Sequence, residues 1–365
     1  MPDSSTACIV ALTLATFASA HAQSSADAPV RVNVDNFARA ESDLYMGKSV
    51  KSGGLGRFVH SREAVAIDAQ DVIRMNRDTL YSSAVFDLDA GPVTVTLPEA
   101  GERFMSMQVV NEDHYVPAVI YGPGPHTLAK EDIGTRYVFV AIRLFFDPTN
   151  RKDLEQVHAL QDAIQVSQAR HGEFVVPKWD QASQKKVRDA LAVLGSTLPD
   201  YNQSFGPKGR VDPVRHLIGT ATGWGGNPSR DAIYLGAVLP HNDGKTVYRL
   251  KVEQVPVKSF WSVSVYNADG YFQKNPYDAY SLNNLTAKKS ADGSIVIQFG
   301  GARPRSSIAW LRHPAGTTPS GSIDRVTKYS VANGVFQRPS PSICKFEYSS
   351  KCKFVETTDS CHRYL

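Results

Sequence analysis

The chain has 365 residues, of which 42% are hydrophobic, 21% charged and 10% aromatic, as in a soluble globular protein with room for two domains. Forty basic and 36 acidic residues leave a net charge of +4 without a basic stripe, so we expect no nucleic-acid partner. The longest apolar run is too short to span a bilayer comfortably, and we expect no transmembrane span.

Residues 1–22 have the pattern of a signal peptide. An apolar run from Ala7 to Ala20 ends in small residues before Gln23, as signal peptidase requires. The segment before the run lacks Lys and Arg, which we attribute to a misplaced start codon. We predict that residues 1–22 are cleaved and that the mature protein is periplasmic or secreted. A buried apolar segment is the alternative, but the polar residues that follow make it a poor one.

The body of the chain has no cysteine. One cysteine lies in the predicted signal peptide, and the other three, Cys344, Cys352 and Cys361, lie within the last 22 residues. A secreted body without cysteines is stabilised by core burial and not by disulfides.

The first β block is marked by alternating apolar and polar residues. The stretch 76–88 opens with polar turn residues and then alternates, and 93–97 and 105–109 repeat the period. The stretch 136–143 is nearly continuously apolar, so we predict a central strand there. A helical spacing at 34–46 precedes the block. We assign residues 30–146 to an N-terminal β-sandwich domain.

A helical segment is predicted at 147–215, because apolar residues fall on one helical face at 152–170 and again at 180–196. A second β block follows at 216–301. Strand patterns occur there at 234–239, 246–252, 260–266 and 294–299, with hairpin signals at Asn242-Asp243-Gly244 and Asp292-Gly293.

Two ordered sets of motifs carry a family resemblance. Asn76-x-Asp78-Thr79-Leu80-Tyr81-Ser82, with Pro98 and Gln108, resembles the bacterial domain of unknown function 1254. Its usual C-terminal companion, domain of unknown function 1214, is similar to this chain at Gly223-Trp224-Gly225, Phe260-Trp261-Ser262-x-Ser264-x-Tyr266, Asp269-Gly270, Asn275-Pro276, Tyr280-Ser281-Leu282 and Asp292-Gly293-Ser294. The resemblance implies an immunoglobulin-like β-sandwich, a helical insert and then a jelly-roll β-sandwich, in agreement with the mainly β pattern. It implies no settled activity.

The resemblance stops after Gly301, where the family continues with a segment like NCLxTPxGWNYTVRLYRP. A shifted reading frame restores this segment. In that frame each codon consists of the last base of one present codon and the first two bases of the next. From Ser307 to Phe336 the residues permit the reading NCLATPPGWNYTVRLYRPSDEILSGEWRF. We therefore predict that residues 302–365 are an out-of-frame tail and that the jelly-roll domain, 216–301, is truncated. Its final strand would be missing, which would leave unpaired backbone groups on the neighbouring strand.

Polar residues gather at two places in the first block, at 76–81 before one predicted strand and at 108–115 after another. Carboxylates beside a histidine can act as general acid and base, or bind a cation. On this hypothesis Asp78, Asp113 and His114 are catalytic, and the ring of His114 titrates near neutral pH. In the alternative, which carries more weight, Asn and Asp cap turns and Arg77 pairs with such an Asp.

The second block is rich in aromatic residues, whose flat rings stack on sugars in many jelly-rolls. The alternative is a core with tyrosines at its rim, which the alternation at 260–266 favours. Our candidate ligand-binding residues from both blocks are Asn76, Arg77, Tyr81, Gln108, Tyr115, Trp224, Trp261 and Tyr266.

The sequence contains no strong catalytic motif. The Gly-x-Ser-x-Gly elbow and the His-Glu-x-x-His helix are absent, and Gly223-Trp224-Gly225-Gly226 lacks the phosphate-loop lysine and reads as a turn. We assign no cofactor and no metal. The expected function is non-enzymatic binding of a carbohydrate, an envelope component or another small ligand. A hydrolase-like enzyme and a structural envelope protein are the alternatives.

Overall fold

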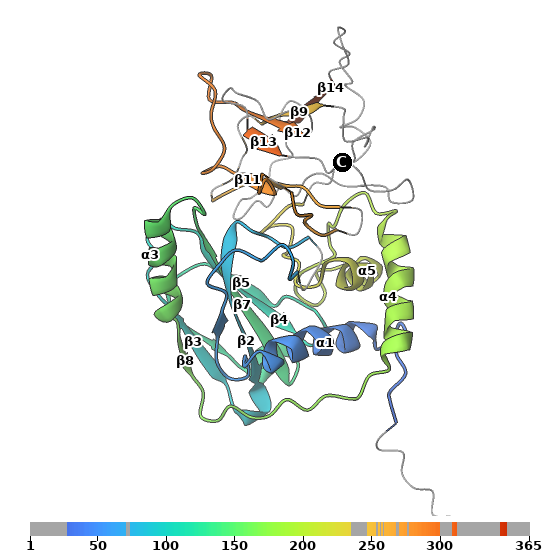
Figure 1. The fold of residues 1–365 in the computed structure, drawn as a ribbon. Coiled ribbons are helices and arrows are strands. Elements are labelled where there is room, and N and C mark those ends of the chain that lie inside the picture. The colour runs from blue at the N-terminus through green and yellow to red at the C-terminus, as the bar shows by residue number, and fades with distance from the viewer. Residues whose placement is uncertain are drawn as a thin grey trace, which may run out of the picture.

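The computed structural model is mainly β, with helices packed around open sheets (Figure 1). The predicted signal peptide lies outside the described residues. No helix within the described ranges combines the length and the apolar character that a bilayer crossing requires. The structure describes residues 28–70, 74–234, 247–252, 255, 257, 259–267, 270–275, 277–299, 309–311 and 344–348.

A five-stranded antiparallel sheet forms the centre of the first block. Its strands, in spatial order, are β1 (Val59–His60), β2 (Thr79–Asp87), β7 (Tyr137–Phe145), β4 (Met105–Asn111) and β5 (Ala118–Ile120). The strand predicted at 136–143 is therefore confirmed as β7, and it is central. Its nearly continuous apolar sequence follows from burial on both faces of the sheet.

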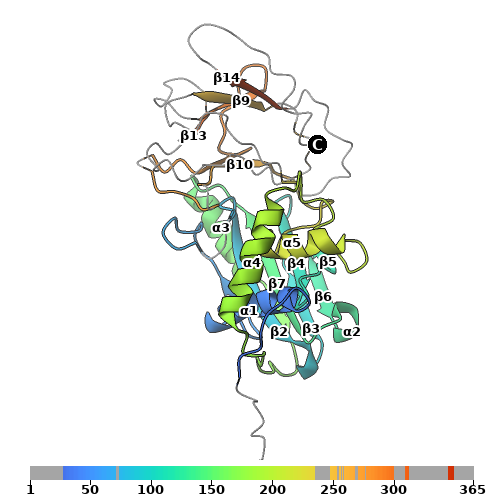
Figure 2. The same ribbon diagram turned by 90° about the vertical axis from the view of Figure 1, so that its right-hand side faces the viewer.

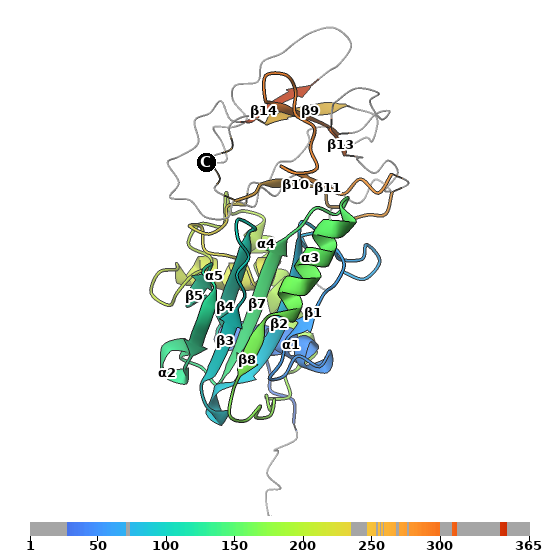
Figure 3. The same cartoon turned by 90° about the vertical axis from the view of Figure 1, so that its left-hand side faces the viewer.

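One face of this sheet packs against a second, three-stranded sheet and a helix (Figure 3). The second sheet has the order β6 (Gly124–Leu128), β3 (Val93–Leu97) and β8 (Gln165–Ser167), and the helix is α3 (Arg151–Asp162). The two sheets share one apolar core, which includes Leu80, Phe86, Val93, Val95, Met107, Val109, Val140, Ile142, Leu144 and Val157.

The helix predicted at 152–170 is shorter than expected. It ends at Asp162, because residues Gln165–Ser167 leave the helical path and pair with β3 as strand β8. Tertiary pairing overrides the helical spacing there. Two short elements complete this block, the 3-10 turn η1 (Leu88–Ala90) and the one-turn helix α2 (Lys130–Ile133).

Three helices lie on the other face of the five-stranded sheet: α1 (Phe37–Lys51), α4 (Gln181–Gly195) and α5 (Pro213–Gly223) (Figure 2). The helix predicted at 180–196 is confirmed as α4, and the one predicted at 34–46 is α1, which begins and ends later. We did not predict α5. Its start has a local signal, because Asp212 accepts a hydrogen bond from the Arg215 amide and Pro213 occupies the first turn.

The second block also consists of two sheets that share a core. β10 (Ser262–Ser264) pairs with β11 (Ser281–Asn283), and β9 (Tyr248–Val252) pairs with β12 (Ile295–Phe299). Strands β9, β10 and β12 fall inside predicted ranges. The predicted strand 234–239, except its first residue, and the predicted hairpin turn at 242–244 lie outside the described residues. The shared core includes Tyr248, Leu250, Trp261, Val263, Ile295, Ile297 and Phe299.

Two strands come from the segment that we predict to be out of frame. β13 (Ala309–Leu311) lies beside β12, and β14 (Cys344–Tyr348) lies beside β9, so the sheet order is β13-β12-β9-β14. The expectation of unpaired backbone groups on the neighbouring strand was therefore wrong. Ladder hydrogen bonds join backbone groups of almost any sequence, so this pairing is compatible with either reading frame.

Candidate functional site

The predicted catalytic residues lie at opposite ends of the five-stranded sheet. β2 and β4 are both antiparallel to β7, so they run in the same direction. Asp78 precedes β2, whereas Asp113 and His114 follow β4. Thr79 is opposite Phe145 and Asn111 is opposite Val138, seven residues apart along β7. At about 3.4 Å per residue this is ~24 Å. The structure does not bring Asp78 and His114 into one site.

Asp78 lies at the junction of the two blocks. Its backbone amide donates to Asn76 Oδ1 at 2.7 Å, and Asn76 Nδ2 donates to Thr79 Oγ1 at 3.1 Å, so Asn76 caps a turn. Asp78 Oδ1 accepts a hydrogen bond from Asn283 Nδ2 of β11 at 3.0 Å. The opening of the motif 76–82 therefore holds the second block against the first.

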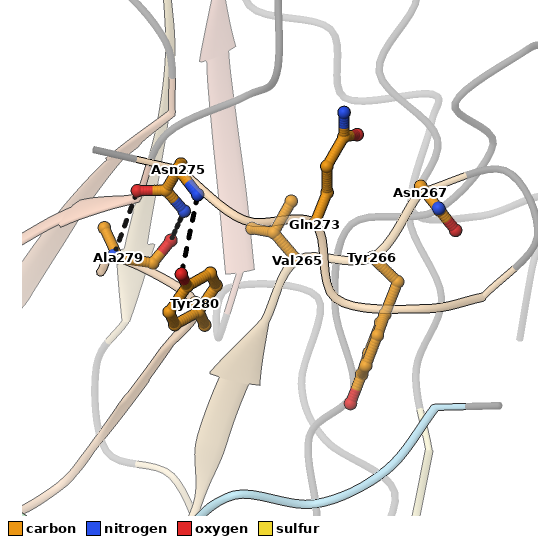
Figure 4. Close-up of a pocket in the computed structure, with 7 residues that line it drawn as sticks. All are labelled: Val265, Tyr266, Asn267, Gln273, Asn275, Ala279 and Tyr280. Carbon is orange, nitrogen blue, oxygen red and sulfur yellow. Dashed lines mark hydrogen bonds between the residues drawn. The ribbon is translucent and has the colours of Figure 1, made fainter. Parts of the chain in front are cut away.

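Arg77 and Tyr266 belong to the same junction. The Arg77 guanidinium lies 5.3 Å from the centre of the Tyr280 ring. The Tyr266 side chain is buried, which raises the pKa of its hydroxyl, and that hydroxyl donates to the Met75 carbonyl at 2.8 Å. In Figure 4 the Tyr266 ring points towards the pale-blue N-terminal segment. The adjoining cavity measures about 10 Å³, which is room for about one water.

His114 is fully buried, and both of its ring nitrogens have partners. The Gly225 amide donates to Nε2 at 2.8 Å, so Nε2 carries no hydrogen. The Thr220 hydroxyl donates to the His216 carbonyl, so it accepts from His114 Nδ1 at 2.8 Å. This network fixes the neutral Nδ1–H tautomer. Burial, and next the nearby His216, lower the pKa of His114 well below its usual value.

The other predicted residues after β4 also have structural partners. Asp113 Oδ1 accepts from Arg39 at 2.6 and 2.9 Å. Tyr115 stacks on His216 with the ring centroids 4.4 Å apart. These contacts join the end of β4 to α1 and α5.

The predicted tryptophans also pack against other side chains. Trp224 stacks on Tyr45 of α1 with the ring centroids 4.7 Å apart, and its Nε1 donates to Ser42 Oγ at 3.1 Å. Trp261 lies in the core of the second block. Neither ring is free to stack on a sugar.

Asp43 of α1 and Glu112 after β4 form a buried acidic pair, of which Asp43 was not expected from the sequence. Burial raises the pKa of Asp43 to about 7 and also raises the pKa of Glu112. Asp43 Oδ2 accepts from Trp179 Nε1 at 2.8 Å, and Asp43 Oδ1 is buried without a hydrogen-bond partner. Arg39 lies 3.6 Å from Glu112. Within the described residues, no three His, Cys, Asp or Glu side chains are grouped as metal ligands would be.

The main candidate site is a row of polar side chains across the three central strands of the five-stranded sheet, near the end where β2 and β4 begin. Tyr81 of β2 lies directly opposite Arg143 of β7, which in turn lies opposite Ser106 of β4. We call these three residues the polar row. It is on the face turned away from the sheets' shared core, because successive side chains alternate between the faces. Gln108 of β4 is two residues from Ser106 and belongs to the same face.

Arg143 is the centre of the polar row and is 4% exposed. Its Nε donates to Ser106 Oγ at 3.2 Å, and its Nη2 donates to Asn227 Oδ1 at 3.4 Å. The guanidinium lies 5.5 Å from the centre of the Phe104 ring. No carboxylate of the described residues lies within ion-pair distance of Arg143. Arg143 was not singled out from the sequence, because it is the last residue of the predicted strand 136–143. An arginine at the end of a strand is usually solvated.

The segment after α5 closes over the polar row. Gln108 Nε2 donates to the carbonyls of Gly225 and Gly226 at 3.1 and 2.9 Å. A Cβ atom on Gly226 would stand 2.4 Å from the Phe205 ring, so only glycine fits between Gln108 and Phe205. The turn expected around Trp224 is present, because the Gly226 amide donates to the Gly223 carbonyl at 2.9 Å.

Two predicted ligand-binding residues, Tyr81 and Gln108, thus meet on one face of the sheet. The Tyr81 side chain is partly exposed, and its hydroxyl has no hydrogen-bond partner among the described residues. Beyond Ser106, the Tyr121 hydroxyl donates to Asp231 Oδ1 at 2.9 Å. Burial, and next Asp231, raise the pKa of Tyr121.

A larger surface hollow of about 370 Å³ lies at the other end of β2. Asp87 and Arg136 line it, and they already pair with each other at 2.8 Å. Asp89, Arg170 and Glu173 give the remaining lining both signs of charge. This balance favours no particular ligand.

Fold and site together define a protein of two β blocks, clamped at Asp78, with a buried polar row on the larger sheet. Residues 55–123 match the family model described as protein of unknown function (DUF1254), and residues 239–320 match protein of unknown function (DUF1214). The chain therefore carries a match to DUF1254 followed by a match to DUF1214, in the order that its motifs predict. The second match extends 19 residues beyond Gly301, where we expected the resemblance to end.

Two solved structures are similar to this chain. One is the VPA0106 protein from Vibrio parahaemolyticus, with 16% identity and a TM-score of 0.62 over 87% of this chain and all of that one. It shares the fold. The other is an uncharacterised protein from Burkholderia cenocepacia, with 13% identity and a TM-score of 0.49 over 83% of this chain and 86% of that one. No curated protein matches the chain.

Proposed function

We propose that this protein binds a small polar ligand at the polar row and performs no chemistry on it. The observation that carries this proposal is the placement of Tyr81, Arg143 and Ser106 side by side on a largely covered sheet face. Polar side chains in such a place cost desolvation free energy unless they find partners. Binding sites commonly place a few convergent polar groups among apolar walls.

A small ligand fits the site better than a glycan laid on an aromatic face. Trp261 and Tyr266 are buried, and the Tyr266 hydroxyl already has a partner. The hydrolase-like alternative has weaker support, because Asp78 and His114 are about 24 Å apart by the register of the sheet. The fully buried His114 also has both ring nitrogens in hydrogen bonds.

The proposal includes the compartment and the finer fold. We propose a periplasmic or secreted protein, on the basis of the apolar segment before Gln23. We also propose an immunoglobulin-like sandwich for the first block and a jelly-roll for the second. The apolar cores that each pair of sheets shares support this assignment.

A thermal-shift screen tests the binding proposal. The panel contains neutral sugars, polyols, amino acids and small carboxylic acids. We expect at least one compound to raise the melting temperature with a saturating dose dependence. Tyr81→Phe removes only the hydroxyl and should weaken that response without lowering the melting temperature of the free protein.

Tyr201→Phe is the matched control, because Tyr201 lies between α4 and α5 and its hydroxyl also lacks a hydrogen-bond partner among the described residues. It should leave the ligand response unchanged. A panel without any stabilising compound overturns the proposal. So does a response that Tyr81→Phe and Arg143→Gln both leave intact, because the ligand then binds elsewhere.

A further inference from the structure

We infer that the ligand of the polar row carries a single carboxylate, which Arg143 binds. This inference rests on the proposed function and specifies the chemistry of the same site. It follows from the charge of Arg143, its burial and the kind of groups around it.

Arg143 is the most buried arginine among the described residues, yet its hydrogen-bond partners are neutral. Other arginines of the described chain pair with carboxylates although they are more exposed; examples are Arg39, Arg62, Arg103, Arg136, Arg188, Arg215 and Arg230. A buried cation without an anion is unfavourable, and an incoming anion removes that cost.

The guanidinium has donors left for a ligand. It has five N–H groups, and the hydrogen bonds to Ser106 and Asn227 use two of them. Two N–H groups of an arginine fork match the two oxygens of a carboxylate. The Tyr81 hydroxyl, opposite Arg143 in the register, can add a further donor to the same oxygens.

The surroundings favour one negative charge over several. Arg143 is the only buried arginine of the described residues, and no buried lysine lies among them. Arg230 lies beyond Tyr121 and already pairs with Asp231 at 3.2 Å, so it does not supply a second cation for a phosphate-like dianion. A monocarboxylate therefore suits the charge of the site better than a phosphate.

Aromatic rings lie next to the charged centre. Phe104 packs below Arg143, and Phe260 from the second block contacts Phe104 and Phe145 at ring-centroid distances of 5.2 and 4.4 Å. These buried rings make the surroundings of the guanidinium apolar, which suits an apolar body attached to the carboxylate. The structure thus points to a small monocarboxylic acid with a flat apolar part.

The test compares benzoate with benzamide, which has the same shape and no charge. Calorimetry and thermal shift on the full chain should give a benzoate affinity at least about tenfold higher than the benzamide affinity, at matched ionic strength. Arg143→Gln should remove this preference. Arg103→Gln is the control, because Arg103 pairs with Asp153 at 2.5 Å and takes no part in the polar row. It should keep the preference.

A second measurement needs no ligand and guards against a failure of folding. Arg143→Met replaces the cation by an apolar chain of similar length, so the melting temperature of the free protein should stay level or rise. A large loss would show that Arg143 is held by an anion of the chain itself and would overturn the inference.

The two proposals can fail separately. If neutral compounds of the screen bind but benzoate has no advantage over benzamide, binding stands and the carboxylate inference falls. Benzoate binding that persists in Arg143→Gln has the same consequence. If neither the screen nor benzoate changes the melting temperature, both proposals fall.

Discussion

Asn283 Nδ2 donates a hydrogen bond to Asp78 Oδ1 at 3.0 Å and so joins two residues that are 205 positions apart in the chain. Asp78 lies within the DUF1254 match and Asn283 within the DUF1214 match. Asn283 Oδ1 in turn accepts from the amides of Leu285 and Thr286 at 2.9 Å each. One buried contact therefore links the start of β2 with the turn that follows β11.

Asp78→Ala should lower the free energy of unfolding by about 2–3 kcal/mol, because it leaves the buried Asn283 amide without its carboxyl acceptor. Urea denaturation measures this loss. Asp35→Ala is the control, since Asp35 is exposed at the surface. Equal unfolding free energies for the two variants would contradict the role of Asp78 as a clamp between the blocks.

His114→Asn should remove part of the acid sensitivity of the protein. The folded state keeps His114 neutral, whereas the unfolded chain binds a proton below its usual pKa of 6.5. The unfolded state then holds more protons, so the free energy of unfolding falls as the pH drops below 6.5, by at most about 1.4 kcal/mol per pH unit. Asparagine tolerates the positive φ of 65° at this position.

Urea titrations at several pH values between 4 and 7 test the histidine prediction. The difference in unfolding free energy between the wild type and His114→Asn should shrink as the pH falls. His126→Asn, in β6, serves as the matched histidine control. A curve for His114→Asn that runs parallel to the wild-type curve would refute the assignment of a neutral ring.

Asp43→Asn should stabilise the protein at pH 8. The folded state holds the Asp43 proton up to a pKa of about 7, because burial opposes ionisation, whereas the unfolded chain releases it near 3.8. The folded state binds more protons in this window, so the cost of the carboxylate grows as the pH rises. Removing the charge should raise the free energy of unfolding at pH 8 by about 1–3 kcal/mol, and by less at pH 5.

Denaturation at the two pH values decides the Asp43 prediction. The amide oxygen of the introduced asparagine can still accept from Trp179, so the comparison isolates the charge. Asp35→Asn provides the matched exposed control. Destabilisation of Asp43→Asn at pH 8 would mean that the ionised carboxylate is needed in the fold.

Sequencing of the locus tests the reading frame of residues 302–365. We expect one inserted or deleted base between Gly301 and Ser307, and the corrected frame should encode NCLATPPGWNYTVRLYRP. A chain rebuilt with this continuation should melt at a higher temperature than the chain described above, because a selected strand replaces an unselected one. An uninterrupted gene that encodes residues 302–365 as they stand in this sequence would end the frameshift hypothesis.

Much of the fold could be predicted because it depends on local patterns. Alternation with a period of two predicted the strands of the first block, and continuous apolar sequence placed β7 at its centre. Helical spacing predicted α4 to within one residue at each end. α5 was missed, since its buried face includes His216, Thr220 and Thr222, which read as polar.

The candidate site could be predicted only in part. Tyr81 and Gln108 were among the expected ligand-binding residues, and both lie on the site face. Arg143 was not expected, and Asp78 and His114 were expected together but lie apart. Motif residues that are close in the sequence often serve turns, as Asn76 does here, and such turns look the same as sites in a linear pattern.

The sequence by itself determined which side chains of each strand face the core, because that choice depends on a period of two along one segment. Only the tertiary structure decided which residues are neighbours across strands. Tyr81, Arg143 and Ser106 form a row because the pairing of β2, β7 and β4 places them opposite one another. The hydrogen bonds of this pairing join backbone groups, which are the same in almost every residue, so the sequence of one strand does not identify its partner.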